Sequence, residues 1–233
     1  MIAVRNLVKS YIVDGRPFMA VDNANFECKK GDYTSIMGHS GSGKSTLLSL
    51  IGGLTRPDSG DIVIDKTNIL SLDDDALSEF RRRKLNFIFQ YSRLIPTLTA
   101  LENVMLPVSL SAVRDRSKEA VKKEAVGLLD MVGLADKINA YPAQLSGGQQ
   151  RRVAIVRSFI NNPDIILADE PTGDLDEETE AEMINIFKRM NREKGITFIV
   201  VTHNSSIANE ARRVLKMHNG RLEEVQSQVP GGQ

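Results

Sequence analysis

Residues 38–45 read GHSGSGKS, and this stretch decides the fold. It matches the pattern G-x4-G-K-[ST], in which glycines let the backbone wrap around phosphates with its N–H groups turned inward. A short apolar run, YTSIM at 33–37, precedes the loop, and a helical pattern, STLLSLI at 45–51, follows it. Strand, glycine loop and helix are the context that a phosphate loop needs, because a helix N-terminus attracts an anion. The stretch therefore predicts an α/β fold that binds a nucleotide.

The residue types of this loop indicate how it would hold the nucleotide. Lys44 is expected to reach the β- and γ-phosphates, and Ser45 is expected to ligate Mg²⁺. His39 is expected to face solvent. The predicted nucleotide contacts of the loop are Gly38, His39, Ser40, Gly41, Ser42, Gly43, Lys44, Ser45 and Thr46.

The run IILADE at 165–170 predicts the acidic half of the same site. An apolar strand delivers an acid at its C-terminal end, where α/β sheets bind ligands. Asp169 is expected to hold Mg²⁺. Its neighbour Glu170 is expected to point to the other side of the strand end and to polarise a water molecule for attack on the γ-phosphate. The alternative for Glu170 is a solvated loop carboxylate.

Three further residues are candidates because of where they stand. Gln90 ends the predicted strand LNFIFQ, and an amide there can sense Mg²⁺ and the attacking water. His203 ends the predicted strand VVTH at the same sheet edge, where a histidine is as readily structural as catalytic. Tyr11 is suited to stacking on an adenine, and a tyrosine on the surface of a sheet is an equally good interpretation.

A second glycine loop, LSGGQ at 145–149, precedes the amphipathic helical pattern QRRVAIVRSFI. Ser146 suits a helix N-cap, and the glycines leave backbone N–H groups available, so this is a second anion site at a helix terminus. Two loops that head separate helices on separate lobes do not readily reach one γ-phosphate within one chain. We therefore expect a homodimer in which two copies stack head to tail, each capping the ATP of the other.

The hydrophobic pattern predicts one domain, 1–233, with an inserted lobe. Alternating residues near the N-terminus predict an antiparallel β subdomain, and continuous apolar runs predict buried strands. The predicted strands are 2–11, 20–28, 33–37, 60–65, 85–90, 165–170 and 196–203, followed by a hairpin over 213–225. Helical spacing takes over in between, with Gly133 where a helix would end. We expect residues 1–90 and 161–233 to form the nucleotide-binding core with the β subdomain, and 91–160 to form a helical subdomain that carries LSGGQ.

Composition excludes several function classes. Lys and Arg number 30 and balance 30 Asp and Glu, so no electrostatic footprint for nucleic acid is expected. The single cysteine, Cys28, allows no disulfide within the chain and suits a reducing compartment. No window approaches the ~18 to 20 apolar residues of a membrane-spanning helix. If the protein works at a membrane, another chain is expected to hold it there.

The order of these motifs resembles that of the nucleotide-binding subunits of ABC transporters, over nearly the whole chain. The resemblance implies a P-loop NTPase with a RecA-like core sheet, which hydrolyses ATP with Mg²⁺. It implies that Tyr11 stacks on adenine, that Gln90, Glu170 and His203 serve catalysis, and that Asp176 is the aspartate of the D-loop. The residues implied to contact ATP across the dimer are Ser146, Gly147, Gly148 and Gln149.

A narrower resemblance comes from residues 80–107 and from ADEPTGDLD at 168–176. They are similar to the subfamily that includes the LolD, MacB and FtsE ATPases. This implies integral membrane permease subunits on separate chains, a groove after Gln90 for a helix of the partner, and a cytoplasmic location on the inner face of the membrane. His39 and Asp174 depart from the subfamily pattern.

Two alternatives remain at this point. One is a soluble ABC ATPase of the iron–sulfur assembly type, without a membrane partner. The other is a P-loop kinase or GTPase, which leaves LSGGQ unexplained. The transported substrate cannot be named from these residues, because the contacts that select it lie in a permease.

Overall fold

Two β-sheets carry the fold, and the computed structural model describes them within residues 1–90, 93–110, 116–173 and 175–225. The smaller sheet is antiparallel, in the strand order β2-β1-β4-β5. In β2, Ala24, Phe26 and Cys28 are buried while Asn25 and Glu27 are exposed, which is the alternation expected of a sheet with one wet face. Its strands are β1 (Ile2–Val13), β2 (Arg16–Cys28), β4 (Ser59–Ile64) and β5 (Thr67–Asn68).

The larger sheet has the strand order β10-β9-β3-β8-β7-β6. All neighbouring pairs are parallel except β9 and β10, which form the predicted hairpin around Asn219 and Gly220. The carboxyl ends of its parallel strands therefore lie along one edge. Its strands are β3 (Tyr33–Met37), β6 (Leu85–Ile88), β7 (Ile165–Asp169), β8 (Thr197–Thr202), β9 (Arg213–His218) and β10 (Arg221–Val225).

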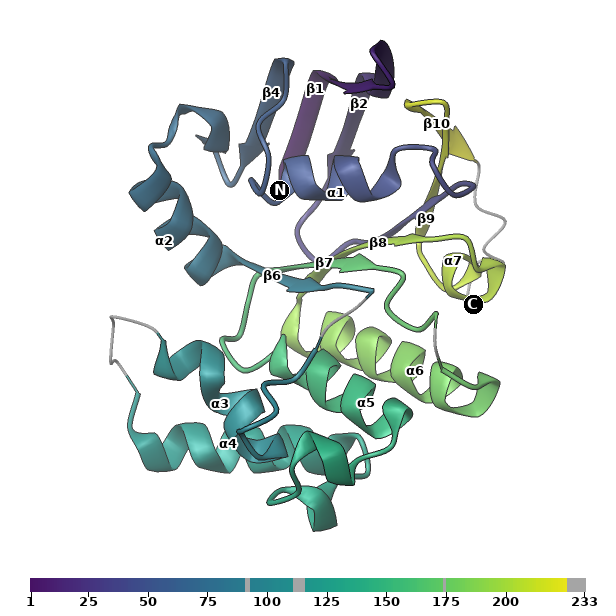
Figure 1. The fold of residues 1–233 in the computed structure, drawn as a ribbon. Coiled ribbons are helices and arrows are strands. Elements are labelled where there is room, and N and C mark those ends of the chain that lie inside the picture. The colour runs from purple at the N-terminus through teal and green to yellow at the C-terminus, as the bar shows by residue number, and fades with distance from the viewer. Residues whose placement is uncertain (91–92, 111–115, 174, 226–233) are drawn as a thin grey trace.

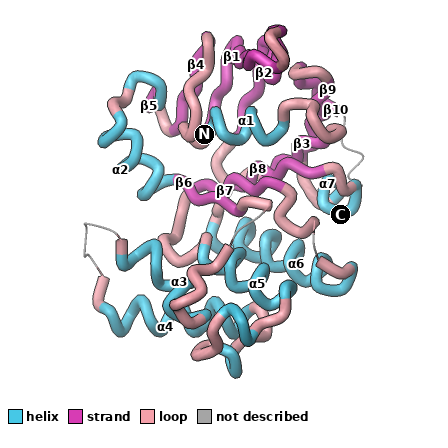
Figure 2. Tube along the Cα trace, viewed as in Figure 1, coloured by secondary structure: helices cyan, strands magenta, loops and turns pink. Residues whose placement is uncertain are grey.

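Helices cover the large sheet on both faces. Figure 1 shows α1 between the two sheets, with α5 and α6 beneath the large sheet and α3 and α4 beyond them, and Figure 2 shows the same separation of strands from helices. The helices are α1 (Lys44–Ile51), α2 (Asp74–Lys84), α3 (Ala100–Ser109), α4 (Lys118–Met131), α5 (Gly147–Arg157), α6 (Glu177–Lys194) and α7 (Ser205–Asn209), with short 3-10 turns at Ile69–Ser71, Ala135–Lys137 and Pro142–Gln144.

Strand β7 separates two hydrophobic cores. Successive side chains of a strand point to opposite faces. Ile165 and Leu167 pack into a core with α1 and the antiparallel sheet, whereas Ile166 and Ala168 pack into a core with α5 and α6. This explains why the strand reads as a continuous apolar run, and it fixes α1 and α5 on opposite faces of the sheet.

The structure ends three predicted strands earlier than expected at functional positions. Strand β7 ends at Asp169 and β8 at Thr202, so Glu170 and His203 each lie one residue beyond their strand. Strand β6 ends at Ile88, so Gln90 lies two residues beyond it rather than at its end. The reason is visible in the backbone, because the carbonyl oxygens of Phe89 and Gln90 bond to the side chain of Arg151 instead of to a neighbouring strand. The domain boundaries at 90/91 and 160/161 stay a prediction, and Asp174 and the tail 226–233 lie outside the described residues.

Across the described parts of the chain, none of the helices combines the length and the apolar character that crossing a bilayer demands.

Candidate nucleotide-binding and catalytic site

The carboxyl edge of the large sheet gathers most of the predicted site residues. Strand β8 lies between β3 and β7, and Met37 is level with Thr202, whereas Asp169 is level with Val201. The loops that leave these three strands carry the glycine loop, the acidic pair and His203. Segments that are far apart in the sequence therefore meet at one edge.

The glycine loop is a tight cradle at the start of α1. Gly43 has φ +104, and a Cβ there would lie 1.9 Å from the carbonyl oxygen of Ala20, so only glycine fits. A Cβ on Gly38 would lie 2.4 Å from the carbonyl oxygen of Met217. The turn after β9 closes the cradle from outside, because the Gly220 N–H donates to the carbonyl oxygen of Ser42 over 3.0 Å.

The polar groups of this cradle fit an anion. Lys44 is only 7 % exposed, and its Nζ donates to the carbonyl oxygens of Gly38 at 2.7 Å and His39 at 3.0 Å. The Ser42 hydroxyl is buried and, within the described residues, has no hydrogen-bond partner. A buried cation, a buried hydroxyl that lacks a partner and the N-terminus of α1 thus meet in one loop, as phosphate binding requires. His39 and Ser40 are exposed, as expected of the loop tip.

Asp169 ends β7 and faces the start of α1. The Ser45 hydroxyl lies close enough to its carboxylate to favour the ionised form. Burial raises the pKa of Asp169, and the Ser45 hydroxyl and the charge of Lys44 oppose that rise. A carboxylate and a hydroxyl therefore lie side by side next to the cradle, and a divalent cation there would stabilise the ionised carboxylate.

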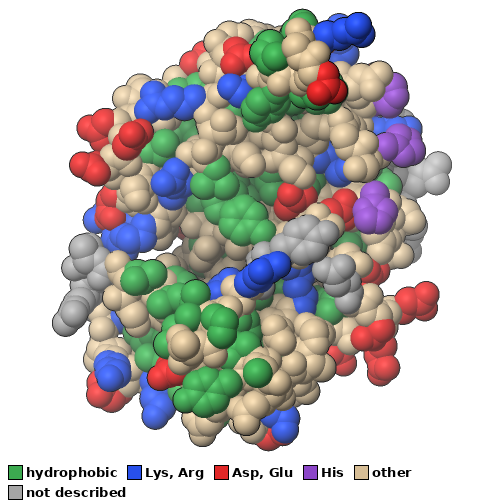
Figure 3. Space-filling model, viewed as in Figure 1, with side chains coloured by type: hydrophobic (Ala, Val, Ile, Leu, Met, Phe, Trp, Pro, Cys, Tyr) green, Lys and Arg blue, Asp and Glu red, His purple; other side chains and the backbone are tan. Residues whose placement is uncertain are grey.

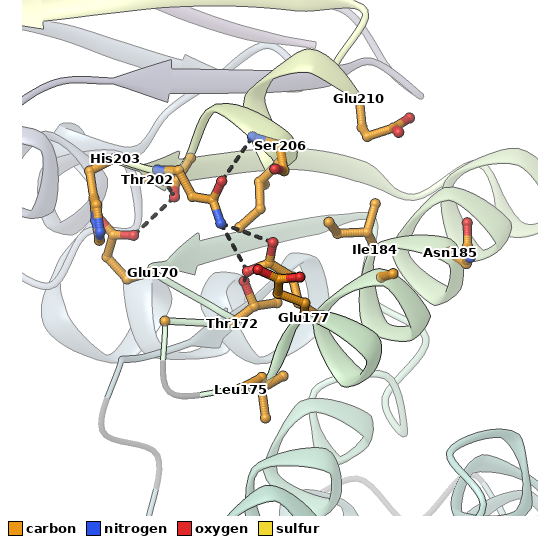
Figure 4. Close-up of a pocket in the computed structure, with 15 residues that line it drawn as sticks. Glu170, Thr172, Leu175, Glu177, Ile184, Asn185, Thr202, His203, Ser206 and Glu210 are labelled. Atoms are coloured by element: carbon orange, nitrogen blue, oxygen red, sulfur yellow. Dashed lines mark hydrogen bonds and ion pairs between the residues drawn. The ribbon is translucent and has the colours of Figure 1, made fainter.

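Glu170 turns away from Asp169 and pairs with the next strand. Its Oε2 accepts a hydrogen bond from the Thr202 hydroxyl at 3.0 Å, and its Oε1 lies 2.9 Å from Nδ1 of His203. The glutamate side chain is 12 % exposed and the histidine side chain 70 %. Figure 4 shows the Glu170 side chain lying beside Thr202 and His203. This carboxylate is oriented, nearly buried and linked to an accessible imidazole.

The backbone of Glu170 is unusual, with φ +42 in the left-handed region. That region costs a non-glycine residue of the order of 1–3 kcal/mol, and it persists only where surrounding contacts hold it. The Glu170 N–H donates to the carbonyl oxygen of Val201 over 3.0 Å, and its own carbonyl accepts from Arg151 Nη2 over 3.0 Å. The bend aims the Glu170 side chain at β8 while Asp169 faces the cradle.

Arg151 joins three segments of the site and was missed by the motif analysis. It lies on α5, is 7 % exposed, and donates from Nε to the Pro171 carbonyl at 2.8 Å and from Nη1 to the Gln90 carbonyl at 2.8 Å. The same fork reaches the carbonyls of Phe89 and Glu170. The Gln90 segment is thereby tied to the end of β7. Thr202 was missed too, because nothing in the sequence places residues 170 and 202 side by side.

The LSGGQ loop caps α5 as its sequence predicts. The Ser146 hydroxyl accepts from the Gln149 N–H at 3.2 Å, and Oε1 of Gln149 accepts from the Ser146 N–H at 2.9 Å. Gln149 therefore turns back on the cap, whereas Ser146 and Gly147 are exposed. Because α5 and α1 cover opposite faces of the sheet, the N-termini of these two helices belong to different layers.

Two predicted nucleotide contacts lie away from the strand edge. Tyr11 is 41 % exposed on β1, opposite Phe18, and Nζ of Lys9 lies 5.4 Å from the centre of its ring. Asp176 is the N-cap of α6, and its carboxylate accepts from the N–H of Thr179 at 2.9 Å and from its hydroxyl at 2.8 Å. These two bonds hold the pKa of Asp176 below its ordinary value.

Comparisons with known proteins point to one family. The family model described as "ABC transporter" matches residues 21–173. A relative from Methanocaldococcus jannaschii, the uncharacterized ABC transporter ATP-binding protein MJ0796, is 45 % identical over 96 % of this chain and 95 % of its own length. A structure of that cassette, a dimer in a post-hydrolysis state bound to ADP and Pi, matches with a TM-score of 0.89 and 43 % identity, over 97 % of this chain and 99 % of the other.

Two named transport ATPases are similar over nearly all of this chain. The lipoprotein-releasing system ATP-binding protein LolD of Syntrophotalea carbinolica is 41 % identical over 95 % of this chain and 96 % of its own length. The macrolide export ATP-binding/permease protein MacB of Rhodopirellula baltica is 41 % identical over 96 % of this chain, which spans 33 % of MacB.

Proposed function

The chain belongs to the ABC transporter family, and from that premise we propose that it hydrolyses ATP at two shared sites of a homodimer to drive a membrane permease carried on separate chains. One structural observation is the main support for the proposed dimer. The cradle of α1 and the exposed N-terminus of α5 lie on opposite faces of the central sheet, so one γ-phosphate meets both only if the second comes from another copy. Ser146, Gly147 and Gly148 would then contact the partner's ATP.

Each residue of the site has a role in this proposal. Lys44 and the loop N–H groups bind the phosphates, and Tyr11 stacks on the adenine. Glu170 accepts a proton from the attacking water, since its carboxylate is oriented by Thr202 and by the exposed His203. Gln90, fixed through its carbonyl by Arg151, presents its amide near the same edge.

Ser45 and Asp169 are the residues that would hold Mg²⁺. The described residues contain no group of three or more His, Cys, Asp or Glu side chains placed to bind a metal ion alone. Magnesium is commonly bound by one or two protein carboxylates together with substrate phosphates and water, so a hydroxyl and a carboxylate beside the cradle suit it. When bound, the ion would neutralise phosphate charge.

The permease is expected to dock on an apolar surface next to the Gln90 segment. Leu54, Phe89 and Ile95 are 47 %, 46 % and 42 % exposed, although most large apolar side chains of the chain are buried. Figure 3 shows hydrophobic side chains gathered across the middle of this face, between the region of α1 and that of α3. The position and the similarity to LolD and MacB support a partner in the membrane and a place on its cytoplasmic face.

The shared sites are tested by mixing two inactive variants. Ser146→Arg blocks the cap that a subunit offers its partner, and Glu170→Gln removes the base of a subunit's own site. Each variant alone is expected to lose hydrolysis, and for Glu170→Gln the loss is expected to be about 10² to 10⁴, the usual effect of losing a general base. A mixed dimer keeps one site with both an intact Glu170 and an intact Ser146. ATP turnover is therefore expected to return when the two are combined, to about a quarter of the wild-type rate if subunits mix at random.

The control is a mixture of Glu170→Gln with Lys44→Ala, which places both lesions on the nucleotide's own subunit and so restores nothing. If neither mixture regained ATP turnover, each chain would complete its own site, and the homodimer proposal would fail. Wild-type turnover by Ser146→Arg alone would remove LSGGQ from the reaction.

A further inference from the structure

The carboxylate of Glu180, in the first turns of α6, joins two loops that leave the large sheet. The Thr172 hydroxyl donates to its Oε2 at 3.1 Å. Nδ2 of Asn204 donates to both of its oxygens at 2.9 Å. Figure 4 shows dashed bonds of this group at the centre of the close-up, between the labelled residues Thr172 and Ser206. One half-buried side chain thus links the segment after β7 to the segment after β8.

The two linked segments hold the proposed catalytic pair. Thr172 stands two residues after Glu170, and Asn204 directly follows His203. The contacts also close on themselves, because the Asn204 N–H donates to the Thr202 hydroxyl oxygen at 3.0 Å, and that hydroxyl donates to Glu170 at 3.0 Å. A ring therefore runs by hydrogen bonds from Glu170 through Thr202, Asn204 and Glu180 to Thr172, and it returns to Glu170 along the backbone of residues 170–172.

The chemistry of these groups fixes which one donates and which one accepts in each hydrogen bond. A carboxylate only accepts hydrogen bonds, and an amide nitrogen only donates them. The Asn204 amide is held in place because its Oδ1 accepts from the Ser206 N–H at 2.8 Å. Its nitrogen therefore faces Glu180, and bonds to an ionised group are about twice as strong as neutral ones. The ring borders a cavity of about 830 Å³ that reaches Ile184 and Ile207.

We propose that Glu180 is a positioning residue for hydrolysis, which holds the Glu170 segment and the His203 segment in a fixed relation through Thr172 and Asn204. This inference rests on the proposed function, because it concerns the same hydrolytic site. Glu180 acts through its neighbours and not on the nucleotide. Its loss therefore lowers kcat for ATP and leaves the KM and the binding of ATP by the Lys44 loop unchanged.

The test exchanges donor and acceptor across the pair. Asn204→Asp alone places two carboxylates at contact distance, so the segments are pushed apart and kcat is expected to fall by about tenfold or more, the scale of a lost bond to a charged group. Glu180→Gln alone removes one acceptor and is expected to lower kcat less. Glu180→Gln combined with Asn204→Asp restores one donor and one acceptor across the pair, and its oxygen still accepts from Thr172. The double variant is expected to regain most of the wild-type kcat.

The retained cap of α7 and a matched control variant separate the effect of the exchange from other effects of the substitutions. Aspartate caps the N-terminus of α7 as asparagine does, so the variant retains the bond from Ser206. Glu177→Gln is the matched control, because Glu177 lies near the start of the same helix, lines the same cavity and is exposed. It is expected to keep the wild-type kcat and KM.

The measurements are kcat, KM for ATP and thermal unfolding of the four proteins and the control. Recovery of kcat in the double variant, with KM steady throughout, supports the positioning role. A wild-type kcat in Glu180→Gln and Asn204→Asp, or a loss in Asn204→Asp that Glu180→Gln does not reduce, overturns it. If Asn204→Asp does not fold, the test rests on the other two variants. A double variant that folds again and a lowered kcat in Glu180→Gln then support the positioning role. A wild-type chain without ATPase activity would instead overturn the proposed function.

Discussion

Thr202 sets the direction of the Glu170 carboxylate. Its hydroxyl is fully buried, donates to Glu170 and accepts from the Asn204 N–H, so both of its hydrogen-bonding roles are used at the site. The left-handed backbone at Glu170 brings the side chain within reach of this hydroxyl. The orientation of the proposed base therefore depends on an uncharged residue of the neighbouring strand.

Replacing Thr202 by valine keeps the shape and removes the hydroxyl. We expect kcat for ATP to fall by about tenfold, because a hydrogen bond to a charged group is worth about 1.5–3 kcal/mol and the carboxylate loses its orientation. Affinity for ATP is expected to be unchanged. Steady-state turnover and equilibrium binding check this. Thr202→Ser retains the hydroxyl and is expected to stay within a few-fold of the wild type, whereas equal loss in both variants would point to packing instead of the hydrogen bond.

At this scale the sequence indicates some residues and hides others. Lys44, Asp169 and Glu170 are found because each belongs to a motif whose chemistry is local. Thr202, Arg151 and Glu180 escape because their partners are distant in the chain: 32 residues separate Glu170 from Thr202, and 61 separate Arg151 from Gln90. Their importance depends on which strands are neighbours, and no local pattern states that. The functional roles of all these residues stay predictions.

Helix α5 combines two tasks on one element. Its N-terminus is capped by Ser146 and exposed, and one turn later Arg151 reaches the ends of β6 and β7. A movement of this helix would therefore be transmitted to the Gln90 and Glu170 segments through the Arg151 side chain. The guanidinium suits this task, because its planar fork can serve several carbonyl oxygens at once.

Arg151→Met is expected to destabilise the protein by about 2–4 kcal/mol, because backbone carbonyls that lie near the core lose their donor. Urea unfolding measures the loss, and ATP turnover is expected to fall with it. Arg157→Met on the same helix is the control, since the one hydrogen bond of the Arg157 side chain within the described residues is a long one, 3.3 Å to the Arg93 carbonyl. Arg151→Lys keeps the charge without the fork and is expected to lie between the wild type and Arg151→Met. Full stability of Arg151→Met would show that the fork does not hold the segments together.

The elements themselves follow the hydrophobic pattern closely. Strand β7 and helix α1 are predicted to within a residue at either end, because the strand is buried on both faces and the helix follows directly from the glycine loop. The end of β6 is predicted two residues too late. An apolar run shows which residues are buried, but it does not show where the strand's hydrogen bonds end. Here the carbonyls of Phe89 and Gln90 bond to Arg151 of α5, a tertiary contact that no local pattern predicts.

At the scale of the whole molecule, the central sheet separates a nucleotide-facing layer from a helical layer, with an exposed apolar surface between them. Such surfaces mark contacts with other proteins when they are contiguous. The balance of 30 positive and 30 negative residues gives the chain no general attraction to a charged membrane. Attachment to a membrane would therefore depend on a specific partner.

Tagged Glu170→Gln with ATP and Mg²⁺ is expected to form a lasting dimer and to retain an integral membrane protein from detergent-solubilised membranes of the source organism. Ile95→Asp added to it places a charge on the apolar surface and is expected to abolish capture while the dimer persists. Mass spectrometry and size-exclusion chromatography check both. A partner with few spans and a large outer domain agrees with the similarity to LolD and MacB, and a partner with many spans would oppose it. Capture of soluble proteins alone would favour an iron–sulfur assembly type of ATPase.

The glycine cradle has its last support in β9 and the turn after it: the Met217 carbonyl oxygen of β9 lies against Gly38, and Gly220 of the turn bonds to Ser42. A ribosome makes residue 42 long before residue 220, and a domain generally folds as a unit. A nascent chain therefore carries the complete G-x4-G-K-S stretch while the strand that braces it does not yet exist. The phosphate loop can therefore reach its braced form only after residues 217–220 have been made.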